Sequence, residues 1–342
     1  MLDRRIPIQQ LEVTVLLRRG SIGSIGAEFP PVERKYRSRE EFALQHGASA
    51  EDIEKVRAFA SEYGLKVASE DRARRMVKLS GTVQQFSKAF GANLRRCEIN
   101  SRTDKRRTGD LTIPAELEPV VEGVFGLDNR PQAKAHFRIL TTKPDVYAQA
   151  AAVSYSPVQV AKAYGFPSGA TGAGQCIAII ELGGGFNASD LNSFFGNLGI
   201  ATPAVTAVPV DGATNSPTGD ASGPDGEVEL DIEVAGSIAP GAQIAVYFAP
   251  NTDQGFMDAV TTAVHDATWK PEWGPLLKAL QKGRGVINNG RWLGSILEID
   301  RLLEGGDNKR VMGAVVFAGL HFSEVQRNRE VNLFIGAEHG AF

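Results

Sequence analysis

The sequence predicts a mixed α/β protein built from two different parts, a small α+β sandwich followed by the beginning of a doubly wound parallel sheet. In the first part, short strands alternate with capped helices, an order typical of ferredoxin-like sandwiches. In the second part, two strands are apolar throughout, as are strands covered on both faces of a parallel sheet. At 342 residues, the chain is long enough to form both cores.

Composition places the chain among ordinary globular proteins. Hydrophobic residues make up 42% and charged residues 23%, and a formal net charge of −3 gives no reason to expect nucleic acid as a partner. The two cysteines are too few and too widely spaced for a disulfide framework or a metal cluster. The N-terminal residues lack the apolar core of a signal peptide, and no apolar run is long enough to cross a membrane.

The first part is expected to span residues 7–137. Ser38, Ser49 and Thr82 each precede a helical pattern, where a side-chain oxygen can accept a hydrogen bond from the first free backbone amides. The basic stretch 95–107 is interpreted as a solvated loop, with docking against an acidic surface as the alternative. The expected strands lie at residues 11–18, 65–69, 76–79 and 93–98.

Residues 138–154 show no periodicity and are interpreted as a linker, an exposed connection that proteases can reach. The second part is expected to run from 155 to about 267 with a strand–helix rhythm. Its predicted elements are apolar strands at 176–182 and 243–248 and helices at 157–164, 189–198, 226–241 and 256–265. After about residue 268 the rhythm stops, so 268–342 is treated as an unmatched tail.

The helix near Glu227 carries the strongest chemical signal. At about 100° per residue, Glu227 and Asp231 lie about 40° apart, in the middle of an apolar face formed by Val228, Leu230, Ile232, Val234 and Ala235. Glu229 and Glu233 are expected on the opposite face, in water. A buried carboxylate is costly unless it is paired, hydrogen-bonded or protonated, and a second carboxylate beside it raises one pKa. Such a pair indicates acid–base chemistry.

Three long strings carry information beyond local periodicity. They are LSGTVQQFSKAFGA (79–92), GQCIAIIELGGGF (174–186) and GPDGEVELDIEVAGSIAPGAQIAVYFAPNT (223–252). With their neighbours they resemble the sedolisins, or serine-carboxyl peptidases, and within them the kumamolisin group, from residue 7 to about 267. The resemblance implies a ferredoxin-like activation domain at 7–137, with maturation cleavage in the linker. It also implies an incomplete subtilisin-like catalytic domain at 155–267.

In that family, a Glu and an Asp one helical turn apart replace the His and Asp of subtilisin. The resemblance therefore implies that Glu227 is the general base toward a serine hydroxyl and that Asp231 orients and supports it. Glu181 matches a Glu that hydrogen-bonds the catalytic pair, and it follows an apolar strand, where open α/β sheets build their sites. Because a carboxylate base works near its own pKa of about 4, such enzymes suit acidic medium.

The family also requires a nucleophilic Ser in a Gly-Thr-Ser segment and an Asp in an oxyanion segment. Ser295 and Ser323 lack the required neighbours, and Gly306-Asp307 follows a different context, so no nucleophile is identifiable. The family's calcium site would lie in the missing C-terminal part, so no metal or other cofactor is expected in this chain. The tail, 268–342, is expected to be out-of-frame or foreign translation.

We therefore expect the precursor of an acid-acting serine endopeptidase of the sedolisin type, catalytically inactive as written. Its expected partners are a protein or peptide substrate and its own activation domain, with neither nucleic acid nor membrane. Two non-catalytic alternatives remain open. One is a pseudoenzyme with a new C-terminal function, and the other is an activation domain that binds, inhibits or chaperones a related peptidase. The family implies an extracellular location, although no signal peptide is visible.

Overall fold

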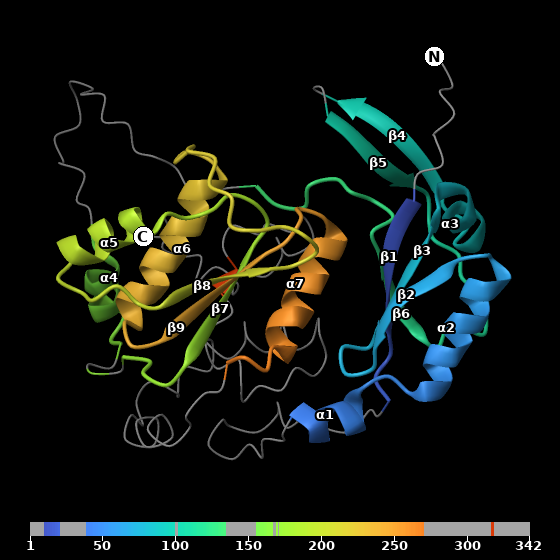
Figure 1. Cartoon of the computed structure of the whole chain (residues 1–342), viewed down its shortest axis with the longest axis horizontal. Coiled ribbons are helices and arrows are strands. Elements are labelled where there is room, and N and C mark those ends of the chain that lie inside the picture. Colours follow the sequence, from blue (N-terminus) through green and yellow to red (C-terminus); the bar gives the residue numbers. More distant parts are fainter. Residues whose placement is uncertain are drawn as a thin grey trace. The chain divides into compact units, whose positions relative to one another are not determined.

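The computed structural model describes residues 10–20, 39–99, 102–134, 155–166, 169, 171–269 and 316–317. These residues form two compact units (Figure 1). The first unit contains the described residues up to Gln132 together with Pro250–His265. The second unit contains the remaining described residues. The expected linker, 138–154, and almost all of the tail after residue 269 lie outside the described residues.

The first unit is built on an antiparallel four-stranded sheet. Its strands are β1 (Gln10–Leu17), β2 (Lys66–Asp71), β3 (Met76–Thr82) and β6 (Val121–Phe125), in the order β2-β3-β1-β6. Since successive side chains on a strand point to opposite faces, the apolar positions of β1 face one core. They are Leu11, Val13, Val15 and Leu17, and Val13 lies opposite Leu79 of β3 in the register.

Two helices of this unit begin where their capping residues predict, while Ser38, the predicted cap of the first helix, lies outside the described residues. Helix α1 spans Arg39–His46, α2 spans Ala50–Glu62 and α3 spans Val83–Ala89. The Ser49 hydroxyl accepts a hydrogen bond from the Asp52 amide (2.9 Å), and Thr82 and Gln85 form a reciprocal capping box at α3. Together with the sheet, α2 and α3 complete a β-α-β-β-α-β order, which agrees with the mixed α/β class expected from the sequence.

The basic stretch after residue 95 forms a hairpin, so its interpretation as a loop was wrong. Strand β4 (Asn93–Ile99) pairs antiparallel with β5 (Arg102–Thr108), with Arg95 opposite Arg106. Strand β5 has the sequence RTDKRRT, with no apolar alternation to reveal it. Pairing with β4, a contact that local pattern does not encode, makes it a strand.

The second unit contains a parallel sheet. Its strands β7 (Cys176–Glu181), β8 (Val205–Pro209), β9 (Gln243–Phe248) and β10 (Val316–Phe317) follow the order β10-β7-β9-β8. Helices α4 (Pro157–Ala163), α5 (Ala188–Asn197) and α6 (Pro224–Ile238) lie together beside it (Figure 1). One core joins the sheet to α5 and α6 through residues such as Ile179, Val246, Leu191, Phe195, Val228 and Ile232. Strand β8, a half-exposed edge, was not predicted.

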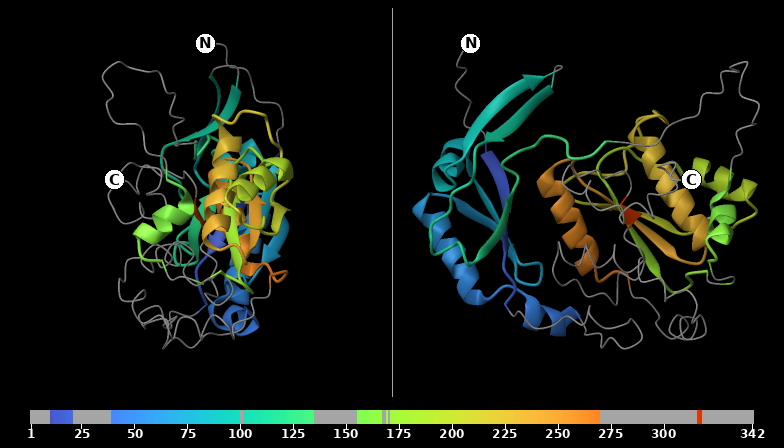
Figure 2. Two further views of the ribbon diagram at one scale, coloured as in Figure 1. Left: turned by 90° about the vertical axis from the view of Figure 1, so that its left-hand side faces the viewer. Right: turned by 180° about the vertical axis from the view of Figure 1, so that it is seen from behind.

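Helix α7 (Asp253–His265) follows β9 in the sequence but belongs to the first unit. Figures 1 and 2 show it on the face of the antiparallel sheet opposite α2 and α3. Within the described part of the chain, no helix has both the length and the apolar character needed to cross a membrane.

Candidate active site

Glu181 is the last residue of β7, and it is buried. All six residues of this strand are buried, and Glu181 is 4% exposed. Its carbonyl accepts a hydrogen bond from the amide of Ala249, which follows the neighbouring strand β9 (2.9 Å). The carboxyl ends of two parallel strands are thereby held at the edge where α/β sheets place their functional groups. The structure thus places Glu181 where the sequence predicted.

A tight glycine turn follows β7, leads the chain toward α5, and passes close to the start of α6. Gly184 has a φ of +68°, and a Cβ atom at this residue would lie 2.6 Å from the carbonyl carbon of Pro224. Only glycine fits this approach without strain. Pro224 is the first residue of α6, so the turn three residues after Glu181 touches the start of the helix that carries Glu227.

Helix α6 turns two carboxylates inward, as predicted. Glu227 and Asp231 are each 6% exposed, and Val228 and Ile232 beside them are fully buried. They lie one turn apart on the same helix. The rest of the predicted apolar face was partly wrong, because Leu230 and Val234 are only half-buried and the inward face is shifted toward the carboxylates. The structure thus brings the Glu227–Asp231 pair and Glu181 onto two elements in direct contact.

The outer face of α6 is less exposed to solvent than the sequence predicted. Glu229 and Glu233 were expected in water, yet both are half-buried. Burial raises the pKa of Glu233 to about 7, and the charges of Glu229 and Asp190 act in the same direction. The pKa of Glu229 is also raised, chiefly by burial. Packing of α4 and α5 against α6 removes the water that an isolated helix would have on this face.

Asp225 is a buried carboxylate that sequence reasoning missed. It is 5% exposed and accepts hydrogen bonds from the Gly185 amide (3.0 Å) and from the amides of Thr218 (2.6 Å) and Gly219 (2.7 Å). The Thr218 hydroxyl donates a fourth bond (2.9 Å). An acidic residue in the first turn of a helix is usually attributed to the helix dipole, so its position alone did not distinguish it.

The described residues contain no group of three or more His, Cys, Asp or Glu side chains that could hold a metal ion. The sequence predicted no metal in this chain, because the family's calcium site belongs to the C-terminal part of the family fold. Ser295, Ser323 and Gly306-Asp307, which were considered as echoes of the missing site segments, lie outside the described residues.

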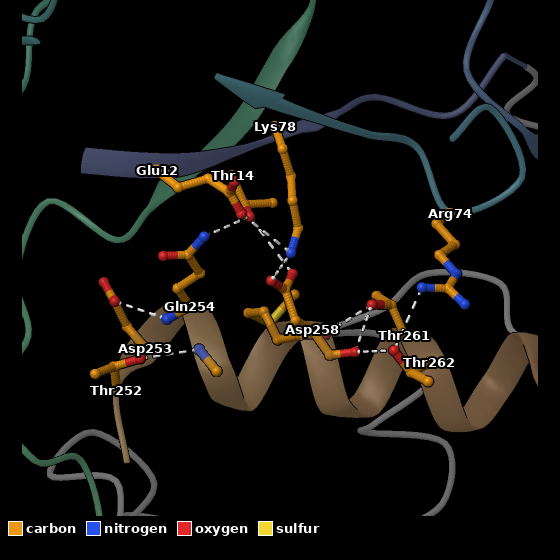
Figure 3. Close-up of polar contacts among 12 residues, drawn as sticks. Glu12, Thr14, Arg74, Lys78, Thr252, Asp253, Gln254, Asp258, Thr261 and Thr262 are labelled. Atoms are coloured by element: carbon orange, nitrogen blue, oxygen red, sulfur yellow. Dashed lines mark hydrogen bonds and ion pairs between the residues drawn. The ribbon is translucent and has the colours of Figure 1, made fainter. Parts of the chain in front are cut away.

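A second polar cluster joins α7 to the antiparallel sheet within the first unit (Figure 3). The Asp258 carboxylate, on a residue that is 3% exposed, lies 2.8 Å from the Lys78 ammonium. The Gln254 amide donates to the Thr14 hydroxyl (3.1 Å), and the Gly126 amide donates to Asp253 (3.1 Å). These partners lie on β1, on β3 and just after β6, so three neighbouring strands of the sheet contribute contacts to one helix.

Comparisons with known proteins connect both units to one family. The model for the pro-kumamolisin activation domain matches residues 29–130. Kumamolisin from Bacillus sp. (strain MN-32) is 48% identical over 273 residues, covering 77% of this chain and 50% of the relative. Tripeptidyl-peptidase sed5 from Aspergillus fumigatus is 25% identical over 267 residues, covering 68% of this chain and 43% of the relative.

A solved structure of Pseudomonas sedolisin (serine-carboxyl proteinase), complexed with two molecules of pseudo-iodotyrostatin, is 25% identical. It has a TM-score of 0.29 and covers 35% of this chain and 34% of its own. The assignment rests on the sequence matches. The chain spans half the length of kumamolisin and less than half of sed5. With the activation-domain match and the extensive identity to kumamolisin, the chain belongs to the sedolisin family and is kumamolisin-like.

Proposed function

We propose that the chain is a serine-carboxyl peptidase precursor that carries the proton-handling half of a sedolisin active site. The observation that carries the proposal is the burial of Glu227 and Asp231, one turn apart on α6, at 6% exposure each. A pair of carboxylates removed from water can exchange a proton at acidic pH, where an imidazole base would already be protonated. Glu227 is the base, Asp231 supports it, and Glu181 lies behind the pair.

The sequence contains no recognisable counterpart of the other residues that the family uses in its active site. Without a Gly-Thr-Ser nucleophile or the oxyanion Asp, the chain itself is expected not to hydrolyse peptides. The subtilisin-like character of residues 155–267, the activation-domain limits 7–137 and an extracellular location form part of the same proposal, and they rest on the family match.

A chimera tests the roles of the carboxylates separately from the activity of the chain itself. Residues 1–267 are fused to the corresponding C-terminal remainder of kumamolisin and assayed on denatured protein at about pH 4, near the ordinary carboxyl pKa. The chimera is expected to cleave, and Glu227→Gln should abolish cleavage. Glu229→Gln, on the half-buried face of the same helix, serves as the matched control and should retain it. Equal loss in both variants would contradict the assignment.

Inactivity of the chain as written has its own test. The unmodified protein is incubated with the same substrate at the same pH, and no turnover is expected. Turnover that disappears in Glu227→Gln would show that the chain contains a working nucleophile and would refute the expectation that the chain is inactive.

A second candidate function is inhibition or chaperoning of a related peptidase, and the contacts of α7 favour it. The sheet β3-β1-β6 presents Lys78, Thr14 and the Gly126 amide to Asp258, Gln254 and Asp253 of α7. A sheet that presents these polar groups can recognise the equivalent helix of a relative. Full-length protein added to active kumamolisin should then slow its hydrolysis, and Lys78→Met should weaken the effect. No inhibition at about micromolar concentration, an affinity of about −8 kcal/mol, would argue against this function.

A further inference from the structure

We propose that Asp225 is a positioning residue that joins the Glu181 end of β7 to the first turn of α6, and thereby sets the placement of Glu181 relative to Glu227 and Asp231. The inference rests on the proposed function of this pair. Asp225 precedes Glu227 by two residues on α6, and its bond to Gly185 reaches the chain four residues after Glu181.

Both oxygens of Asp225 are engaged outside its own helix. One oxygen accepts from the Gly185 amide at 3.0 Å. The other accepts from the amides of Thr218 (2.6 Å) and Gly219 (2.7 Å) and from the Thr218 hydroxyl (2.9 Å). The carboxyl group thus accepts from four donors, one at the first oxygen and three at the second. One side chain therefore fixes the glycine turn and the 218–219 loop to α6.

Helix capping does not account for this arrangement. A capping side chain accepts from the amides of its own first turn, whereas the donors to Asp225 are Gly185, Thr218 and Gly219. The N-cap position of α6, Gly223, has no side chain and forms no such bond. The dipole of α6 favours a negative charge at this end, but it does not require the bond to the turn after β7.

Asn215 provides a natural control because it holds the same turn without reaching α6. Its side-chain oxygen accepts from the Phe186 amide (2.8 Å), and its side-chain nitrogen donates to the Phe186 carbonyl (3.1 Å). Loss of Asn215 loosens the turn. Loss of Asp225 loosens the turn and also releases it from the helix that carries Glu227.

The consequence can be observed in proton binding. Interacting carboxylates titrate as a unit, and their midpoints depend on the distances between their charges. Asp225→Asn leaves one acceptor oxygen and brings an amide donor against backbone amides, and it also removes a charge. Asp225→Glu keeps the charge but lengthens the side chain by one methylene group. A change common to both variants therefore reports position and not charge.

The experiment uses the full-length chain with ¹³C-carboxyl-labelled glutamate. The Glu227 resonance is identified by its absence in Glu227→Gln and is followed by NMR through acidic pH. We expect Asp225→Asn and Asp225→Glu each to move the Glu227 midpoint by about 0.5 pH unit or more, a modest shift for buried interacting groups. Asn215→Ala should move it by less. Circular dichroism confirms that each variant is folded. If the Asp225 variants do not fold, Thr218→Val is used instead, because it removes only one of the donors to Asp225.

The outcomes separate this inference from the proposed function. An unchanged midpoint in folded Asp225 variants, or a change in Asp225→Asn alone, would overturn the positioning role. An equal change in Asn215→Ala would overturn it as well, since the link to α6 would then not matter. If Glu227 in the parent chain titrates independently of Asp231, as judged with Asp231→Asn, the proposed catalytic pair fails regardless of the result at Asp225.

Discussion

Replacing Glu233 by Gln should stabilise the protein at neutral pH and leave its stability almost unchanged at acidic pH. Glu233 is half-buried on the outer face of α6. Its pKa rises from 4.5 to about 7, first because of burial and then because of the charges of Glu229 and Asp190. Gln has nearly the same shape but no proton to lose, so it reproduces the neutral form of Glu233 at every pH.

The sign follows from proton linkage. In the unfolded chain Glu233 releases its proton near pH 4.5, whereas the folded protein holds it until about pH 7. Between these values the folded state binds more protons, so this side chain makes stability fall as the pH rises. A difference of about 2.5 pH units corresponds to about 3.5 kcal/mol at about 1.4 kcal/mol per unit. Screening by water around a half-buried group reduces the expected effect to about 2 kcal/mol.

Urea unfolding of the parent and Glu233→Gln, followed by circular dichroism at about pH 4 and about pH 8, measures the difference. The variant should be more stable by about 2 kcal/mol at the higher pH and equal within about 0.5 kcal/mol at the lower pH. Asp220→Asn is the control of opposite sign, because hydrogen bonds from Ser222 lower the pKa of Asp220, so its loss should reduce stability at about pH 8. A gain from Glu233→Gln that is equal at both pH values would refute the reasoning.

Three further predictions concern the first unit. Lys78→Met removes the cation 2.8 Å from the buried Asp258 carboxylate and should lower the free energy of unfolding by about 2 kcal/mol. A loss below about 0.5 kcal/mol in urea titrations would show that this contact adds little. Thr82→Ala deletes the α3 capping box and should cost about 1 kcal/mol, whereas Thr82→Ser should retain most of it; faster amide exchange in α3 provides the readout. Burial opposes ionisation of Asp52, but bonds from Arg18 and Ser49 hold its pKa below the usual value. Arg18→Met should therefore destabilise at neutral pH, and this deficit should disappear as acid protonates Asp52; a pH-independent deficit in melting experiments would contradict it.

Local sequence signals predicted the elements whose stability is local. Ser49 and Thr82 were recognised as caps because a hydroxyl directly before an amphipathic run satisfies the first amides of a helix, and both form those bonds. The apolar strand ending at Glu181 was equally evident, because burial on both faces requires an uninterrupted apolar run. The inward direction of Glu227 and Asp231 followed from helical geometry alone.

Non-local contacts decided the elements that the sequence did not reveal. Strand β5 is too basic to show alternation and exists through its pairing with β4. Strand β8 is a half-exposed edge held in register by β9. Glu233 was placed in water because the periodicity of one helix cannot show that α4 and α5 cover its outer face.

The sequence by itself determined the family, the mixed α/β class and the identity of the candidate site residues, because these depend on residue type, spacing and similarity. Only the tertiary structure decided what surrounds those residues. Asp225 became visible through its bonds to Gly185 and Thr218, which lie 40 and 7 positions away in the chain. Lys78 and Asp258 are separated by most of the described chain and meet at 2.8 Å. Such contacts arise from packing, and a linear pattern does not record which chain segments packing brings together.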